Sequence, residues 1–172
     1  VVGGRDATAA ALRSVECFDP STGQWSAVAP MSTARYGHGV AVVDGKLHTV
    51  GGVDGTNTAL SSVESFDPST GQWSVVAPMS TARYDHGVAV VDGKLYAVGG
   101  VNGTNNDLRS VECFDPSTGQ WSWVAPMSTA RYDHGVAVVD GKMYAVGGCN
   151  ATAHTSLRSV ECRDWRRGRY HT

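Results

Sequence analysis

The stretch RYDHGVAVVDGKLYAVGGVNGTNNDLRSVECFDPSTGQWSWVAPMSTA, Arg83 to Ala130, decides the fold because it recurs along the chain. Nearly the same text occupies 35–82, a third copy begins at Arg131, and Val1 lies near the middle of an earlier copy. The step between copies is about 48 residues, and a fixed period between about 20 and 50 residues indicates a repeat architecture.

Each copy contains four short segments that predict β-strands. In the copy at 35–82, two apolar, β-branched runs flank Asp44-Gly45, a dipeptide that favours a tight hairpin because the turn requires positive φ. Asp67-Pro68-Ser69-Thr70-Gly71 is a second turn, in which proline fixes one φ and glycine adopts a left-handed conformation. The expected strands are 38–43, 46–50, 62–66 and 72–76. With no helical periodicity, the pattern predicts an all-β fold with one antiparallel four-stranded sheet per copy.

A small four-stranded sheet buries both faces only when further sheets stack on each side, and radial stacking produces a β-propeller. The copy at 35–82 resembles a kelch repeat in three places: Gly51-Gly52 after the second strand, Phe66-Asp67-Pro68 in the third, and Trp73 opening the fourth. The resemblance covers Val1 to about Cys162 and implies that the first strand of each blade is innermost. We expect the recurrent aromatic residues to pack between blades; they are Phe18, Trp25, Phe66, Trp73, Phe114 and Trp121.

The repeat boundaries predict a partial kelch-type β-propeller of about 3.5 four-stranded antiparallel blades, fewer than the six or seven common in such propellers. The units are a partial blade at 1–34, blades at 35–82 and 83–130, a partial blade at 131–162, and an irregular basic tail at 163–172. Such a piece has two open blade faces. We expect them to be covered by a second copy in a homodimer, or by further blades of a longer parent chain.

Composition excludes several classes of function. A formal net charge of -2 gives no general attraction to nucleic acid or to anionic membranes. No apolar run approaches the roughly 18 residues of a membrane-spanning helix, and no signal peptide is visible. The chain has no CxxC pair, and we expect its cysteines to be small buried thiols in a reducing, cytoplasmic compartment. The cysteines are Cys17, Cys113, Cys149 and Cys162.

The Tyr-Asp-His motif that opens two of the copies resembles acid/base machinery, but its repetition argues against catalysis. A reaction needs unlike groups in unlike roles around one substrate, whereas near-identical copies place the same groups at every blade. His38, His86 and His134 would also lie too far apart to share one metal ion. We expect each histidine to begin an innermost strand and to bond a neighbouring blade. The sequence therefore predicts no enzyme activity, no metal and no cofactor.

The resemblance to kelch adaptor proteins implies a binding face. In that family the loop entering each first strand and the loop after the Gly pair share one face, which receives partner peptides, and its basic residues grip acidic ones. Arginine and tyrosine are enriched at binding hot spots, which suits this role; the alternative is that the arginines pack against the adjacent blade as scaffold. The matching positions are Arg35, Tyr36, Arg83, Tyr84, Arg131 and Tyr132 from the first loop, with Asp54, Thr56, Asn57, Asn102, Thr104, Asn105, Asn106, Asn150 and His154 from the second.

The expected function is therefore a protein–protein interaction module of the scaffold or substrate-adaptor type that binds a protein or an acidic peptide. Adaptors of the family often carry a BTB domain that recruits a ubiquitin ligase, and these residues contain none. Three alternatives remain at this point: an actin-binding kelch protein, part of a kelch-propeller enzyme such as an oxidase or a sugar isomerase, and a fragment without independent function.

Overall fold

The computed structural model describes residues 1–151, 155–164 and 169–171. In these residues the regular structure consists of antiparallel β-sheets, with no helix long and apolar enough to span a membrane. The first sheet has three strands, β1 (Val2–Arg5), β2 (Ala11–Asp19) and β3 (Gln24–Val28). The second has four, β4 (Gly39–Val43), β5 (Lys46–Val50), β6 (Val63–Asp67) and β7 (Gln72–Val76).

The third and fourth sheets repeat the order of the second. The third contains β9 (Gly87–Val91), β10 (Lys94–Val98), β12 (Val111–Asp115) and β13 (Gln120–Val124). The fourth contains β14 (Gly135–Val139), β15 (Lys142–Val146), β18 (Val160–Asp164) and β19 (Arg169–His171). Two short ladders lie in the connecting loops. The pair β8 (Arg83–Tyr84) and β11 (Val101–Asn102) joins two loops, and the pair β16 (Cys149–Asn150) and β17 (Thr155–Ser156) lies within one.

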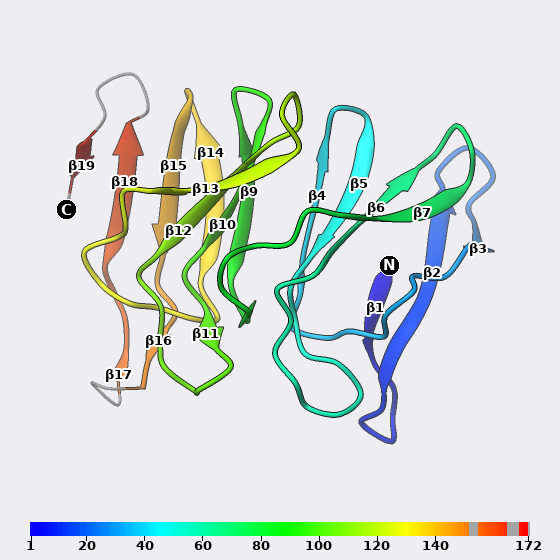
Figure 1. Cartoon of the computed structure of the whole chain (residues 1–172), viewed down its shortest axis with the longest axis horizontal. Coiled ribbons are helices and arrows are strands. Elements are labelled where there is room, and N and C mark those ends of the chain that lie inside the picture. The colour runs from blue at the N-terminus through cyan, green and yellow to red at the C-terminus, as the bar shows by residue number, and fades with distance from the viewer. Residues whose placement is uncertain (152–154, 165–168, 172) are drawn as a thin grey trace.

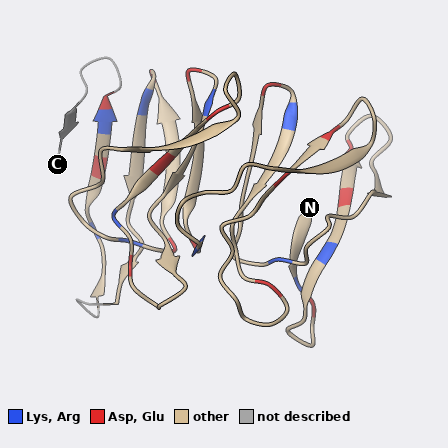
Figure 2. Ribbon diagram, viewed as in Figure 1, with Lys and Arg blue, Asp and Glu red and all other residues tan. Residues whose placement is uncertain are grey.

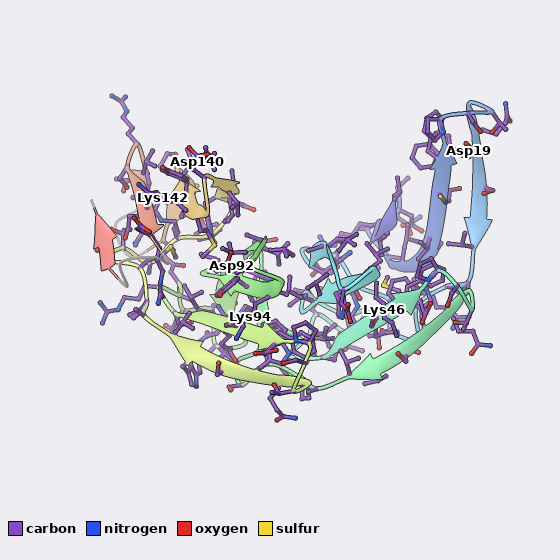
Figure 3. The ribbon with its side chains drawn as sticks, turned by 90° about the horizontal axis from the view of Figure 1, so that it is seen from above. Asp19, Lys46, Asp92, Lys94, Asp140 and Lys142 are labelled. Carbon is purple, nitrogen blue, oxygen red and sulfur yellow. The ribbon has the colours of Figure 1, made fainter. Side chains whose placement is uncertain are left out.

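The four sheets lie side by side along an open arc (Figures 1 and 3). The first strands β4, β9 and β14 are neighbours in space, which confirms that the first strand of each complete unit is innermost. The hairpin turns β4–β5, β9–β10 and β14–β15 lie along one edge, at the top of Figure 1. The loops that follow the Gly pairs lie along the opposite edge.

Turn chemistry behaves as the sequence predicts. Asp44 and Gly45 both have positive φ, of 51° and 69°, as a two-residue hairpin with right-handed strand twist requires. At the Gly pair, Gly51 and Gly52 also have positive φ, and a Cβ on Gly52 would lie 2.7 Å from the Tyr36 carbonyl oxygen. The Gly52 amide donates to the carbonyl of Arg83 in the next blade at 2.8 Å. The Gly pair therefore links neighbouring blades by close backbone contact.

The hydrophobic core lies between blades. Val43, Val50 and Val63 of the second sheet pack with Leu95 and Phe114 of the third. The indole Nε1 of Trp73 donates to the Ala29 carbonyl of the preceding blade at 2.8 Å, and Trp121 makes the same bond to Ala77 at 2.9 Å. The expected packing of these two tryptophans between blades is confirmed.

The same expectation is wrong for Phe18 and Trp25, which are 44% and 55% exposed. In the second sheet the equivalent pair, Phe66 and Trp73, lies on the side of the preceding blade. No sheet of the described chain precedes β1, so Phe18 and Trp25 contact each other, with ring centroids 5.2 Å apart, but no preceding blade covers them.

The tail differs from the sequence expectation of an irregular segment from residue 163. Strand β18 continues through Asp164, because Asp164 pairs with Lys142 of β15. Residues 169–171 form β19, which pairs with β18 through Arg163 and Asp164. A ladder offered by a neighbouring strand can order a segment that lacks a strand pattern of its own.

The four cysteines are free thiols, but the expectation that all of them are buried is wrong. Cys113 is buried between the third and fourth blades, Cys149 and Cys162 are half-buried, and Cys17 is exposed at the incomplete first unit.

Candidate functional site

The three recurrent arginines do not reach solvent. Arg35, Arg83 and Arg131 are each 0% exposed. Arg83 donates from Nη1 to the carbonyl oxygens of Gly99 at 2.8 Å and Ser110 at 3.2 Å, and from Nη2 to Glu112 Oε1 at 2.8 Å. The expectation that these arginines grip a partner is therefore wrong, because a guanidinium already enclosed by its own chain has no access to a ligand. The arginines are scaffold residues, but their guanidinium groups bond within their own unit rather than to the adjacent blade that the alternative named.

The glutamates that hold these arginines were missed by the sequence analysis. Glu64, Glu112 and Glu161 occupy equivalent strand positions, and each also accepts backbone N–H bonds from the loop of the preceding blade, as Glu112 does from Ser80 at 2.6 Å and Thr81 at 3.1 Å. Burial alone would raise the pKa of Glu64, but the bonds from Ser32 and Arg35 outweigh it and lower that pKa. The recurrence of a glutamate in a strand otherwise rich in apolar residues was the available signal.

The two predicted loops do share one face. Tyr36 exchanges backbone hydrogen bonds with Val53, Tyr84 pairs with Val101 in the β8–β11 ladder, and Tyr132 pairs with Cys149. This face lies along the lower edge of Figure 1. The rings of Tyr36, Tyr84 and Tyr132 are half-buried, so one tyrosine from each of three successive units remains accessible there.

Much of the second loop uses its polar groups to hold its own shape. Asp54 Oδ1 accepts from the backbone amides of Thr56 at 2.8 Å and Thr58 at 3.0 Å. Asn102 takes the same role for Thr104 and Asn106. These expected binding residues are at the face, but their side chains are internally bonded. The loops are therefore ordered before any partner arrives.

Asn57 and Asn105 connect the two loops. The Tyr36 hydroxyl donates to Asn57 Oδ1, and the Tyr84 hydroxyl donates to Asn105 Oδ1, each at 3.0 Å. Both asparagines have positive φ, which their residue type tolerates. In the last unit, Asn150 donates through its side-chain amide to the Ala130 carbonyl. His154 lies outside the described residues.

Pockets lie between successive tyrosines. One of about 290 Å³ is lined by Tyr36, Val53, Tyr84 and Asn105, among others. The next, of about 350 Å³, we call the Tyr84–Tyr132 pocket; its lining consists of Tyr84, Asp85, Val101, Asn105, Asp107, Tyr132 and Ala151.

The recurrent arginines add no exposed charge to this face, and carboxylates are present there; acidic positions appear among the lower loops of Figure 2. The sequence analysis did not place Asp85, Asp107 or Asp133 among the binding residues. Burial raises the pKa of Asp85, the nearby Asp133 raises it further, and Arg5 opposes both effects. Asp107 Oδ2 accepts a hydrogen bond from the Ala151 amide, which fixes its carboxylate at the pocket.

The histidines lie behind this face. His86 is buried and packs against Gly39 and Gly51 of the preceding blade, with both ring nitrogens lacking a hydrogen-bond partner. The expected contact with a neighbouring blade is present, but for His86 it is a packing contact rather than a hydrogen bond. Burial, and secondly the charge of Arg83, holds the pKa of His86 well below its usual value. In the described residues no group of three or more His, Cys, Asp or Glu side chains is arranged to hold a metal ion.

The opposite edge carries a different set of charges (Figure 3). Lys46 pairs with Asp67 at 3.1 Å and Lys94 with Asp115 at 2.6 Å, each across neighbouring strands of one blade. These surface ion pairs neutralise that edge in part, so the two edges of the arc differ in character.

Radially arranged four-stranded antiparallel sheets, with glycine pairs joining blade to blade, define a β-propeller of the kelch type. The chain belongs to the kelch-repeat family: residues 1–148 match the KLHDC2/KLHL20/DRC7 Kelch-repeats domain. Kelch repeats generally serve as protein-interaction modules, and this general class applies to the chain.

Two individual proteins illustrate the likeness. The influenza virus NS1A-binding protein homolog of Mus musculus is 51% identical over 39 residues, which cover 23% of this chain and 6% of that protein. The solved structure of YjhT superposes with a TM-score of 0.81 at 18% identity, over 99% of this chain and 63% of the other. The chain thus spans a small part of the first relative and less than two thirds of the second. At this identity YjhT supports the fold alone.

Proposed function

We propose that this chain is a scaffold or substrate-adaptor module that binds a partner peptide through the face built by its two sets of loops. The observation that carries the proposal is the row of accessible tyrosines, Tyr36, Tyr84 and Tyr132, with pockets between them. Tyrosine is enriched at binding hot spots because it offers a large contact area and a polar tip.

The arrangement of the pockets favours an extended peptide. They follow one another from blade to blade along a single edge, so an extended segment can place successive side chains into successive pockets. The loops are already held by internal bonds, such as those from Asp54 and Asn102. Binding then requires little further loss of conformational entropy in these loops, which favours affinity.

We propose that the module binds without catalysing a reaction, and that it acts in the cytoplasm. Free thiols at all four cysteines fit a reducing compartment. Adaptor function in a ubiquitin ligase complex, which the family resemblance implies, would require a recruiting domain beyond these residues.

Selection from a random peptide library with the purified chain tests the proposal. We expect selected peptides to lose at least tenfold in affinity for the Tyr84→Ala and Tyr132→Ala variants. The control is Trp123→Ala, since Trp123 is an aromatic side chain 54% exposed on the outer strand β13. Peptides that depend on Trp123 and ignore both tyrosines would overturn the proposed face.

A further inference from the structure

One residue breaks the repeat at the candidate face. After the first Gly pair the chain has Arg5, whereas the equivalent positions are Val53, Val101 and Cys149. The guanidinium carbon of Arg5 lies 3.5 Å from the centroid of the Tyr36 ring, in the geometry of a cation–π contact. The positive charge of Arg5 also acts on Asp85. One tyrosine of the face is therefore already covered by a cation from the preceding unit.

The two pockets occupy the equivalent places in the following units. Val53 and Tyr84 line the first pocket, and they correspond to Arg5 and Tyr36. Val101 and Tyr132 stand in the same relation in the Tyr84–Tyr132 pocket. Valine is too short to extend over the neighbouring ring, so the volume that the arginine side chain fills in the first unit is left open in the next two.

The Tyr84–Tyr132 pocket also offers charges that complement a cation. Asp85 and Asp107 are both part of its lining, and Asp133 lies close enough to Asp85 to interact with it electrostatically. The recurrent arginines do not neutralise these carboxylates, because Arg83 and Arg131 are bonded to Glu112 and Glu161 in the interior. Aromatic rings combined with carboxylates recognise alkylammonium and guanidinium groups.

We propose that the Tyr84–Tyr132 pocket binds an arginine or lysine side chain of a partner peptide, with the cation over the Tyr132 ring and beside the carboxylates of Asp85 and Asp107. This inference rests on the proposed function and specifies its partner. It reverses the sequence-based expectation of an acidic peptide. The contact between Arg5 and Tyr36 is the example of this mode within the same molecule.

Three matched peptides test the charge preference. Each is a twelve-residue Gly/Ser peptide with three identical substituted positions, which are arginine in one, citrulline in the second and glutamate in the third. Citrulline keeps the size of arginine and removes its charge. By calorimetric titration at physiological salt we expect the arginine peptide to bind about fivefold more tightly than either of the others, because the pocket takes one cation and that contact is worth about this factor.

Variants locate the binding. The double variant Asp85→Asn/Asp107→Asn removes both carboxylate charges, and the asparagine at 107 keeps an oxygen that can accept the hydrogen bond from the Ala151 amide. We expect this variant to bind the arginine peptide about fivefold or more weakly. The control is the double variant Asp92→Asn and Asp140→Asn, which removes the same charge from the hairpin turns at the opposite edge (Figure 3) and is expected to change affinity less than twofold.

Removal of the internal cation gives an independent measurement. Arg5→Ala frees the Tyr36 ring, and we expect the arginine peptide to bind about two- to fivefold more tightly. Arg13→Ala removes the same charge from an exposed position of β2 and is the control for general electrostatics. Equal effects of the two variants would contradict a specific site at Tyr36.

The outcomes separate this inference from the proposed function. If the citrulline or glutamate peptide binds as tightly as the arginine peptide, and Tyr132→Leu weakens it, the cation preference is wrong and the face stands. If neither the arginine peptide nor any library-selected peptide depends on Tyr84 or Tyr132, both are wrong. If the Asp85→Asn/Asp107→Asn variant binds the arginine peptide as tightly as the wild type does, the proposed cation pocket is also wrong.

Discussion

The substitution Arg83→Met tests whether each recurrent arginine anchors the loop between two blades to the blade that this loop enters. Methionine has a similar length and retains apolar contacts, but it removes the charge and every hydrogen bond of the guanidinium. Arg83 and Glu112 are each 0% exposed and lie 2.8 Å apart. The side chain also holds the carbonyls of Gly99 and Ser110, next to the Gly pair that joins the blades.

The expected loss is about 3 to 5 kcal/mol in the free energy of unfolding, the range for removing one partner of a buried ion pair. It arises because Glu112 remains charged and buried without its cation. Two carbonyl oxygens also lose their donor, and an unsatisfied buried group costs about 1 to 3 kcal/mol. Since domains of this kind are stable by only about 5 to 15 kcal/mol, the variant should lose a large share of its stability.

Urea unfolding followed by tryptophan fluorescence and by far-ultraviolet circular dichroism measures the effect. The control is Arg109→Met, because Arg109 is exposed at the equivalent of Ser61 and should change stability by less than about 0.5 kcal/mol. A loss below about 1 kcal/mol for Arg83→Met, with unchanged transition slopes, would refute the interpretation that this buried pair anchors the loop entering the third blade.

Three further predictions follow from burial and exposure. Trp73→Ala should lower the free energy of unfolding in urea by about 3 kcal/mol, and Trp25→Ala by less than about 1 kcal/mol. The reason is that, of these two residues, only Trp73 is hydrogen-bonded to a preceding blade, whereas Trp25 is exposed. Equal losses would contradict this difference. Burial, and secondly the neighbouring Arg35 or Arg131, lowers the pKa of His38 and His134 from 6.5 to about 4. As the pH falls, the unfolded chain protonates these two histidines before the folded chain does. Their contribution to the free energy of unfolding is therefore fully present above pH 6.5 and is lost as the pH falls from 6.5 through about 4. Unfolding titrations at several pH values should show this loss, and the His38→Phe/His134→Phe variant should reduce it; an unchanged pH dependence would show that other groups cause it. Finally, the isolated chain should self-associate through its open blade faces at micromolar concentration, as measured by sedimentation. The exposed apolar residues on these faces are Phe18, Trp25, Val139, Val146 and Val160. A monodisperse monomer would show that the open faces are tolerated in solution.

The sequence by itself determined the repeat, the strands and the turns. These features are local, because Asp44-Gly45 and Gly51-Gly52 adopt backbone conformations that few other residues tolerate, and alternating or β-branched runs form strands wherever they occur. Repetition then fixed the blade arrangement, since identical sheets have the same faces to bury. The inter-blade role of Trp73 followed from the same reasoning.

Only the tertiary structure decided which side chains of each unit face solvent. Repetition shows that Arg83 has the same environment as Arg35, but it does not show whether that environment is the surface or the interior. Arginine is usually exposed, and its burial here depends on Glu112, a residue distant in sequence that the fold brings within 2.8 Å. The candidate site changed accordingly: the tyrosines stay at the face, the recurrent arginines leave it, and Asp85 supplies charge of the opposite sign. These roles depend on contacts between residues distant in sequence, which no local pattern encodes.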